Sequence, residues 1–152
     1  MKQRMNPLAL APEGLAALTG VERYLQGSGL ARRLVVLVQT RVSQINGCAY
    51  CLHMHTEEAR KLGESDMRLY LLDAWHESSL YSPRERAALA WAETLTNIAT
   101  THAPDDVYEE ARSQFSEREL IDLSIAVAMI NAWNRLCIGA RVAHPSDLAK
   151  AA

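Results

Sequence analysis

Apolar residues recur every three or four positions along most of this chain, which is the spacing of one face of an α-helix. Helix start and stop signals bound these segments, for example Ser82-Pro83 before one of them and Gly63 after another. The pattern predicts about six to seven helices, over residues 12–26, 30–44, 48–62, 65–72, 82–95, 105–114 and 116–140.

Two segments depart from a simple amphipathic pattern. Residues 34–38 (LVVLV) form a continuous apolar run that is also compatible with a short buried strand, but the length of the surrounding segment favours a helix. Residues 120–140 are apolar almost all round, which is typical of a helix at the centre of a bundle. No linker, repeat or low-complexity tract interrupts the chain, so we predict one all-α domain over residues 1–152.

Composition and charge limit the kinds of partner that this protein is expected to bind. The 16 basic and 18 acidic residues nearly cancel and form no blocks, so nothing favours binding to nucleic acid or to an anionic membrane. The longest apolar run near the C-terminus, residues 125–132, is far shorter than the roughly 20 residues that cross a bilayer. Residues 1–10 lack the apolar stretch of a signal peptide. We therefore expect a cytoplasmic protein without a membrane span.

The candidate chemistry lies just after the turn dipeptide Asn46-Gly47. Cys48 and Cys51 are three residues apart and His55 is four residues further on, so in a helix all three side chains project from one face. A free cysteine has a pKa of about 8.5, and the thiolate is the nucleophile. The positive end of the helix dipole and His55 as a base can both favour the thiolate.

The spacing also assigns roles to the three residues as a hypothesis. Cys51 is one turn from His55, whereas Cys48 is two turns away, so we predict that Cys51 attacks a peroxide and Cys48 resolves the sulfenic acid to a disulfide. An external thiol reductant then has to restore both thiols. We predict no cofactor and no bound metal.

The segment 43–51 (SQINGCAYC) with His55 resembles the active-site signature of the AhpD-like alkylhydroperoxidase family, which is related to carboxymuconolactone decarboxylases. The similarity continues through residues 56–60 (TEEAR) and 130–135 (INAWNR), so it covers most of residues 30–140. The resemblance implies an all-helical fold, homo-oligomers and reduction of small-molecule hydroperoxides through the Cys-x-x-Cys pair.

One position departs from the family pattern. Members with a full proton relay are similar to one another in carrying a glutamate twelve positions before the first cysteine, where this chain has Val36. Tyr50 replaces a histidine that some members carry between the two cysteines. Without an acidic partner His55 is expected to be a weaker base, which leaves two alternatives open: a decarboxylase-like enzyme without redox change, and a redox sensor that does not turn over.

Other interpretations of these residues are less favoured. Cys48, Cys51 and His55 could belong to a zinc site, but a fourth ligand is missing unless the fold brings His76 or Cys137 near. Cys137 itself is interpreted as a buried small hydrophobe without a role. His53 is expected at the surface or between subunits, and the polar side chains of the last helix, Arg135 among them, are expected to be structural.

Overall fold

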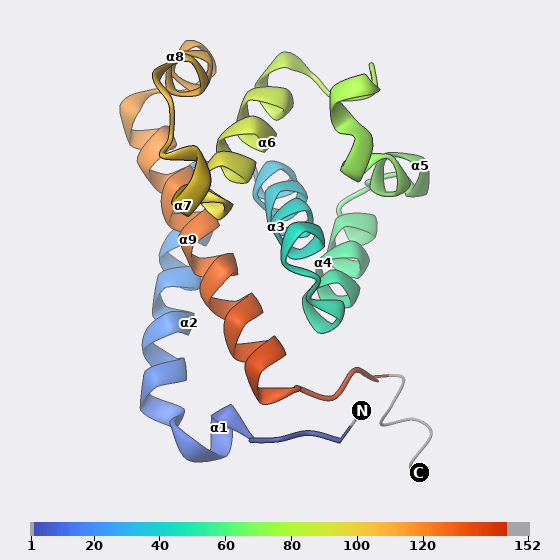
Figure 1. Ribbon diagram of the computed structural model, residues 1–152, viewed down its shortest axis with the longest axis vertical. Helices are drawn as coiled ribbons and strands as arrows, with labels where there is room; N and C mark the ends of the chain where they lie inside the picture. Colours follow the sequence, from blue (N-terminus) through green and yellow to red (C-terminus); the bar gives the residue numbers. More distant parts are fainter. Residues whose placement is uncertain (1, 146–152) are drawn as a thin grey trace.

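The computed structural model describes residues 2–145. Within that range the chain forms nine α-helices and one short 3₁₀ helix, with no strand, which confirms the predicted all-α class (Figure 1). The elements are α1 (Pro7–Leu10), α2 (Pro12–Gln26), α3 (Arg32–Asn46), α4 (Ala49–Lys61), α5 (Asp66–Tyr70), η1 (Leu72–Glu77), α6 (Pro83–Thr96), α7 (Ile98–Thr101), α8 (Asp105–Gln114) and α9 (Glu117–Ala140).

The helix count is slightly higher than predicted because three elements are too short to be recognised from the sequence. α1 and α7 have four residues each and η1 has six, so none of them repeats the helical period often enough to be detected from the sequence. The longer predicted helices form within a few residues of their expected ends. Ser82 and Ser116 both close the capping boxes that their sequences indicate.

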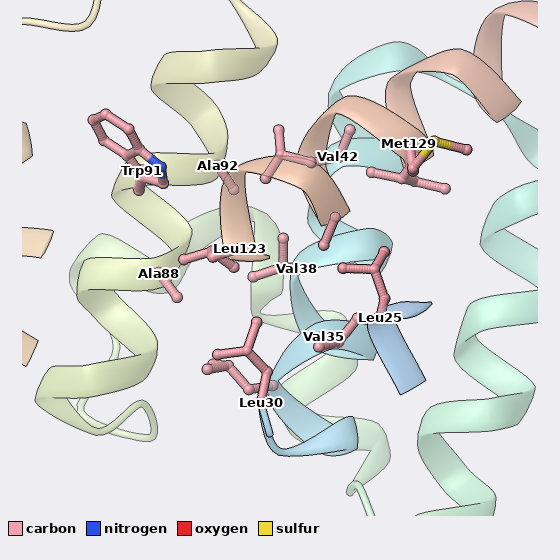
Figure 2. Packing of buried hydrophobic residues seen from close by; sticks show 14 of the residues in the cluster. Leu25, Leu30, Val35, Val38, Val42, Ala88, Trp91, Ala92, Leu123 and Met129 are labelled. Atoms are coloured by element: carbon pink, nitrogen blue, oxygen red, sulfur yellow. The ribbon is translucent and has the colours of Figure 1, made fainter. Parts of the chain in front are cut away.

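Helix α3 lies at the centre of the bundle, where it contacts α4, α6 and α9 (Figure 1). Residues 34–38 are therefore buried on every side of the helix, and this explains why their sequence is a continuous apolar run. The strand alternative for this segment is wrong. Figure 2 shows Val35, Val38 and Val42 of α3 packed among Ala88 of α6 and Leu123 of α9.

Helix α9 is the long apolar helix that the sequence places in the core. It packs against α2, α3 and α6, and its buried residues include the polar side chains of Asp122, Asn131 and Asn134. Its length and mean hydropathy would also suit a membrane span, but a core helix passes the same test, so this is weak evidence for a membrane.

Candidate active site

The candidate site forms at the turn between α3 and α4. Gly47 ends α3 with a φ of 68°, in the left-handed region that a residue without Cβ adopts at low cost. Cys48 is then the N-cap of α4, and its Sγ atom accepts a hydrogen bond from the backbone N–H of Cys51 at 3.4 Å. The two sulfur atoms therefore lie at the positive end of the α4 dipole.

Cys48 and Cys51 form a disulfide, with their Cα atoms 5.3 Å apart. Both side chains are only 1% exposed. The spacing in the sequence predicts that these thiols can approach each other, and the structure brings them into covalent contact. The two cysteines differ in one respect, because Cys51 lines a pocket beside the disulfide and Cys48 does not.

A largely apolar pocket of about 570 Å³ opens beside this disulfide. Its walls come from the N-terminal segment and from α1, α2, α3, α4 and α9, so only the folded chain creates it. Tyr50, Cys51 and His55 of α4 face it together. Its apolar surface is provided mainly by Leu8, Leu15, Met54, Trp133 and Leu136.

His55 lies one turn after Cys51 and its side chain is buried. Burial lowers the pKa of His55 to about 4, the Glu58 carboxylate opposes this shift, and the Arg32 charge adds to it. The imidazole is therefore neutral near pH 7 and able to accept a proton. Among the described residues no side chain or backbone group hydrogen-bonds to either ring nitrogen.

Glu58 supplies the carboxylate that Val36 does not. Its Oε2 atom is 3.9 Å from Nδ1 of His55, and its Oε1 atom is 2.6 Å from the guanidinium of Arg32. Val36 instead packs in an apolar cluster with Ala59 and Leu69. His55 thus has an acidic neighbour three residues along its own helix, which a comparison with the family pattern at position 36 does not reveal.

Helix α3 contributes one polar side chain to the pocket, Gln39. The residue is 1% exposed, and no group in residues 2–145 donates a hydrogen bond to its Oε1 atom. A buried carbonyl oxygen without a donor is costly, so this atom marks a place where a polar group of a bound molecule can be stabilised. In the sequence, the signal for this position is a polar residue directly after the apolar run of residues 34–38.

Polar side chains of α9 hold the α3–α4 turn in place. The amide of Asn46 donates to Oδ1 of both Asn131 (2.9 Å) and Asn134 (2.8 Å), and Asn134 donates to the Ser43 hydroxyl at 3.1 Å. Arg135 donates to the carbonyl and the side-chain oxygen of Asn131. These contacts give the polar residues of α9 the structural role expected from the sequence.

Cys137 has a different environment from the one predicted. It is half-buried rather than fully enclosed, it lines the pocket, and its Sγ atom lies within 4.8 Å of the sulfur atoms of both Cys48 and Cys51. Burial raises the pKa of its thiol. The interpretation of Cys137 as a simple core residue is therefore incomplete.

The other histidines that the sequence singled out do not join this site. His53 is partly exposed, 3.8 Å from Glu57 and in ring contact with His144, in agreement with a position outside the Cys51–His55 face. His76 is exposed, stacks on Trp75 and lies 3.6 Å from Glu93. Neither lines the pocket.

The fold and the site define an all-helical protein with a Cys-x-x-Cys pair at the start of a helix and a buried histidine one turn later. The model of the carboxymuconolactone decarboxylase family matches residues 10–94, which is more than half of the chain. The chain belongs to this family, in its AhpD-like group.

Relatives and solved structures agree with this assignment. The chain is 42% identical to the uncharacterized protein YdfG of Bacillus subtilis over 138 residues, which is 91% of this chain and 94% of YdfG. A structure from Agrobacterium tumefaciens, of a protein of unknown function named as a candidate antioxidant defence protein AhpD, is 42% identical with a TM-score of 0.92, over 95% of this chain and 99% of that one. A peroxidase-related protein of Silicibacter sp. TM1040 is 26% identical with a TM-score of 0.75, over 85% and 69%.

Proposed function

We propose that this protein is a thiol-dependent hydroperoxide reductase that uses Cys51, Cys48 and His55. One observation carries the proposal: Cys51 is both half of the disulfide and part of the lining of the apolar pocket that contains His55. A thiol in that position can meet a substrate in the pocket and then pass the oxidation to Cys48. The antioxidant and peroxidase-related descriptions of the similar structures support the same function.

The surroundings favour ionisation of Cys51 in the reduced protein. Its sulfur lies in the first turn of α4, where the helix dipole stabilises an anion. His55 is neutral, so it can accept the thiol proton, and the Glu58 carboxylate 3.9 Å from its ring stabilises the imidazolium that results. Because burial disfavours that imidazolium, the proton is readily given up again to a leaving group.

The Cys51 thiolate attacks the terminal oxygen of the hydroperoxide, the O–O bond breaks, and the alkoxide leaves as an alcohol with the proton from His55. Cys51 is now a sulfenic acid, which Cys48 attacks to form the disulfide with loss of water. An external dithiol then returns two electrons and two protons. The reductant is expected to be a partner of this protein.

The pocket indicates the kind of hydroperoxide. Apolar side chains from four parts of the chain cover most of its surface. Binding of an organic substituent against this surface is favourable because it removes apolar area from water. We therefore expect organic hydroperoxides to be better substrates than hydrogen peroxide. We also expect a homo-oligomer, since apolar side chains such as Leu8 and Leu10 of α1 remain exposed on the single chain.

The decisive measurement is multiple-turnover consumption of cumene hydroperoxide with dithiothreitol as reductant. We expect sustained turnover by the wild type and its loss in Cys48→Ser and in Cys51→Ser. Turnover should also fall strongly in His55→Gln, whereas His53→Gln, on the outer face of the same helix, serves as the matched control and should behave as the wild type. Activity on a lactone acid that survives Cys48→Ser would instead indicate a decarboxylase-like enzyme, and a single turnover would indicate a sensor.

Trapping of the sulfenic acid distinguishes the two thiols. A dimedone-type reagent should label Cys51 in Cys48→Ser, because no resolving thiol is present. In Cys51→Ser, Cys48 should remain unlabelled. The reverse labelling pattern would exchange the two roles while leaving the dithiol cycle intact.

A further inference from the structure

The chain contains three cysteines, and the fold brings all three sulfur atoms together. The Sγ atoms of Cys48, Cys51 and Cys137 all lie within 4.8 Å of one another. Two come from the start of α4 and the third comes from α9, more than eighty residues later in the chain. The dithiol cycle needs only Cys48 and Cys51, so the position of the third sulfur calls for a separate explanation.

The spacing of the three sulfur atoms is close to that of a metal thiolate site. Zinc binds cysteine sulfur at about 2.3 Å, so the corners of a tetrahedron around it are about 3.8 Å apart. Once the Cys48–Cys51 disulfide is reduced, these two sulfurs can separate, and a movement of about 1 Å brings Cys137 to the same distance. Thiolates are the preferred ligands of zinc and other soft cations.

We propose that the reduced protein binds one zinc ion through Cys48, Cys51 and Cys137. Cys51 and Cys137 both line the pocket, so the fourth coordination position faces it and is open to a water molecule. The pocket also provides the entry path for the ion. The sequence alone does not place Cys137 near the cysteine pair, whereas the fold brings its sulfur atom within 4.8 Å of both.

The ligands are held from both sides. The backbone N–H of Cys51 donates to the Cys48 sulfur, which is an outer contact of the kind that orients metal ligands. Asn134, one turn before Cys137 on α9, hydrogen-bonds Asn46 and Ser43 on the other side of the turn. These contacts fix the position of α9 relative to the start of α4 before any ion binds.

Zinc binding and disulfide formation exclude each other, because the disulfide consumes two of the three ligands. Oxidation by a hydroperoxide, the oxidant class of the proposed function, transfers two electrons from the Cys48 and Cys51 thiolates and uses two protons to give the disulfide, an alcohol and water. Cys137 takes up a third proton, and the zinc ion leaves. The site would thus report the redox state of the pair, and zinc binding itself does not depend on peroxidase turnover.

The test uses the full chain, reduced and kept without oxygen. Zinc is titrated in competition with a chromogenic chelator, and Co²⁺ is used in parallel because thiolate ligation gives it a charge-transfer absorption. We expect one ion per chain in the reduced protein and none after oxidation to the disulfide. In Cys137→Ser the affinity for zinc should fall by about a hundredfold, because the loss of a residue that only hydrogen-bonds to a metal ligand already lowers metal affinity by up to that factor.

The control is Ile138→Ser, which changes an exposed side chain of the same helix turn, outside the pocket, without removing a ligand. It should bind zinc as the wild type does. Thiol counting must show that Cys137→Ser still forms the Cys48–Cys51 disulfide, so that a loss of zinc is not a loss of fold. Equal affinity of Cys137→Ser and wild type, or no stoichiometric binding by the reduced wild type, would overturn the zinc site and leave the proposed peroxidase function untouched.

Discussion

Glu58 places its Oε2 atom 3.9 Å from Nδ1 of His55 while its other oxygen is paired with Arg32. The positive guanidinium of Arg32 contacts the Glu58 carboxylate, and this carboxylate lies beside the neutral, buried imidazole of His55. Burial lowers the pKa of His55 most strongly, the Glu58 carboxylate opposes this shift, and the Arg32 guanidinium adds to it. The basicity of His55 is therefore set by its burial and by its two charged neighbours, Glu58 and Arg32, and not by the residue at position 36.

This relationship predicts the effect of Glu58→Gln. The change removes the charge that stabilises protonated His55 and leaves the positive charge of Arg32 uncompensated, so the pKa of His55 should fall further. We expect kcat/KM for cumene hydroperoxide to fall by roughly tenfold, a modest part of what a positioned acid or base contributes. The acid limb of the pH–rate profile should move to lower pH.

Glu57→Gln is the matched control for that experiment, because Glu57 is exposed and contacts only His53, at 3.8 Å, among the ion pairs of the described residues. Its activity and pH profile should remain those of the wild type. An unchanged pH–rate profile in Glu58→Gln would show that Glu58 does not influence the pKa of His55.

The low pKa of His55 also predicts a pH dependence of stability for the oxidised protein. The unfolded chain binds a proton at His55 below about pH 6.5, whereas the folded chain does so only below about pH 4. The unfolded state therefore gains protons in this window, and the free energy of unfolding should fall as the pH drops from 6.5 to 4, by up to about 3 kcal/mol from this residue. Above pH 6.5 this contribution is constant.

Urea unfolding at several pH values measures this dependence. His55→Gln should show a weaker decrease between pH 6.5 and 4 than the wild type, and His53→Gln should keep the full decrease. If the free energy of unfolding had the same pH dependence in the wild type and in His55→Gln, the imidazole of His55 would not be buried in the folded protein.

The hydrogen bonds between α9 and the α3–α4 turn should contribute to stability. Asn134→Ala removes one of the two acceptors of the Asn46 amide and leaves the fully buried hydroxyl of Ser43 without its donor. Because a buried polar group without its partner costs about 1–3 kcal/mol, we expect a loss of about 2 kcal/mol in the free energy of unfolding. Asn97→Ala, at an exposed helix end, should change it by less than about 0.5 kcal/mol.

The apolar pocket predicts a change in substrate preference. Leu136 lines the pocket, and Leu136→Trp should fill part of the volume that a bulky organic group would occupy. We expect KM for cumene hydroperoxide to rise several-fold while the rate with hydrogen peroxide changes little. Leu71→Trp, at a position of the same 37% exposure but outside the pocket, is the control. Equal effects on both peroxides would argue against binding of the organic group in this pocket.

Much of the fold could be predicted because its determinants are local. Ser82 and Ser116 cap the helices that follow them through contacts three residues away, and Gly47 and Gly63 provide the left-handed conformations that end helices. The pairing of Cys48 with Cys51 follows from their spacing in the same way. Such features depend on the backbone geometry of a single turn, so the sequence by itself determines them.

The rest of the site depends on contacts between residues that are distant in the sequence. Asn46 meets Asn134 across 88 positions, and Cys137 reaches the cysteine pair only because α9 packs against α3 and α4. The pocket needs side chains from the N-terminal segment as well as from α9. Helical periodicity identifies which face of a helix is apolar but not which helix covers it, so the fold alone decided these neighbours, the burial that neutralises His55, and the third sulfur beside the disulfide.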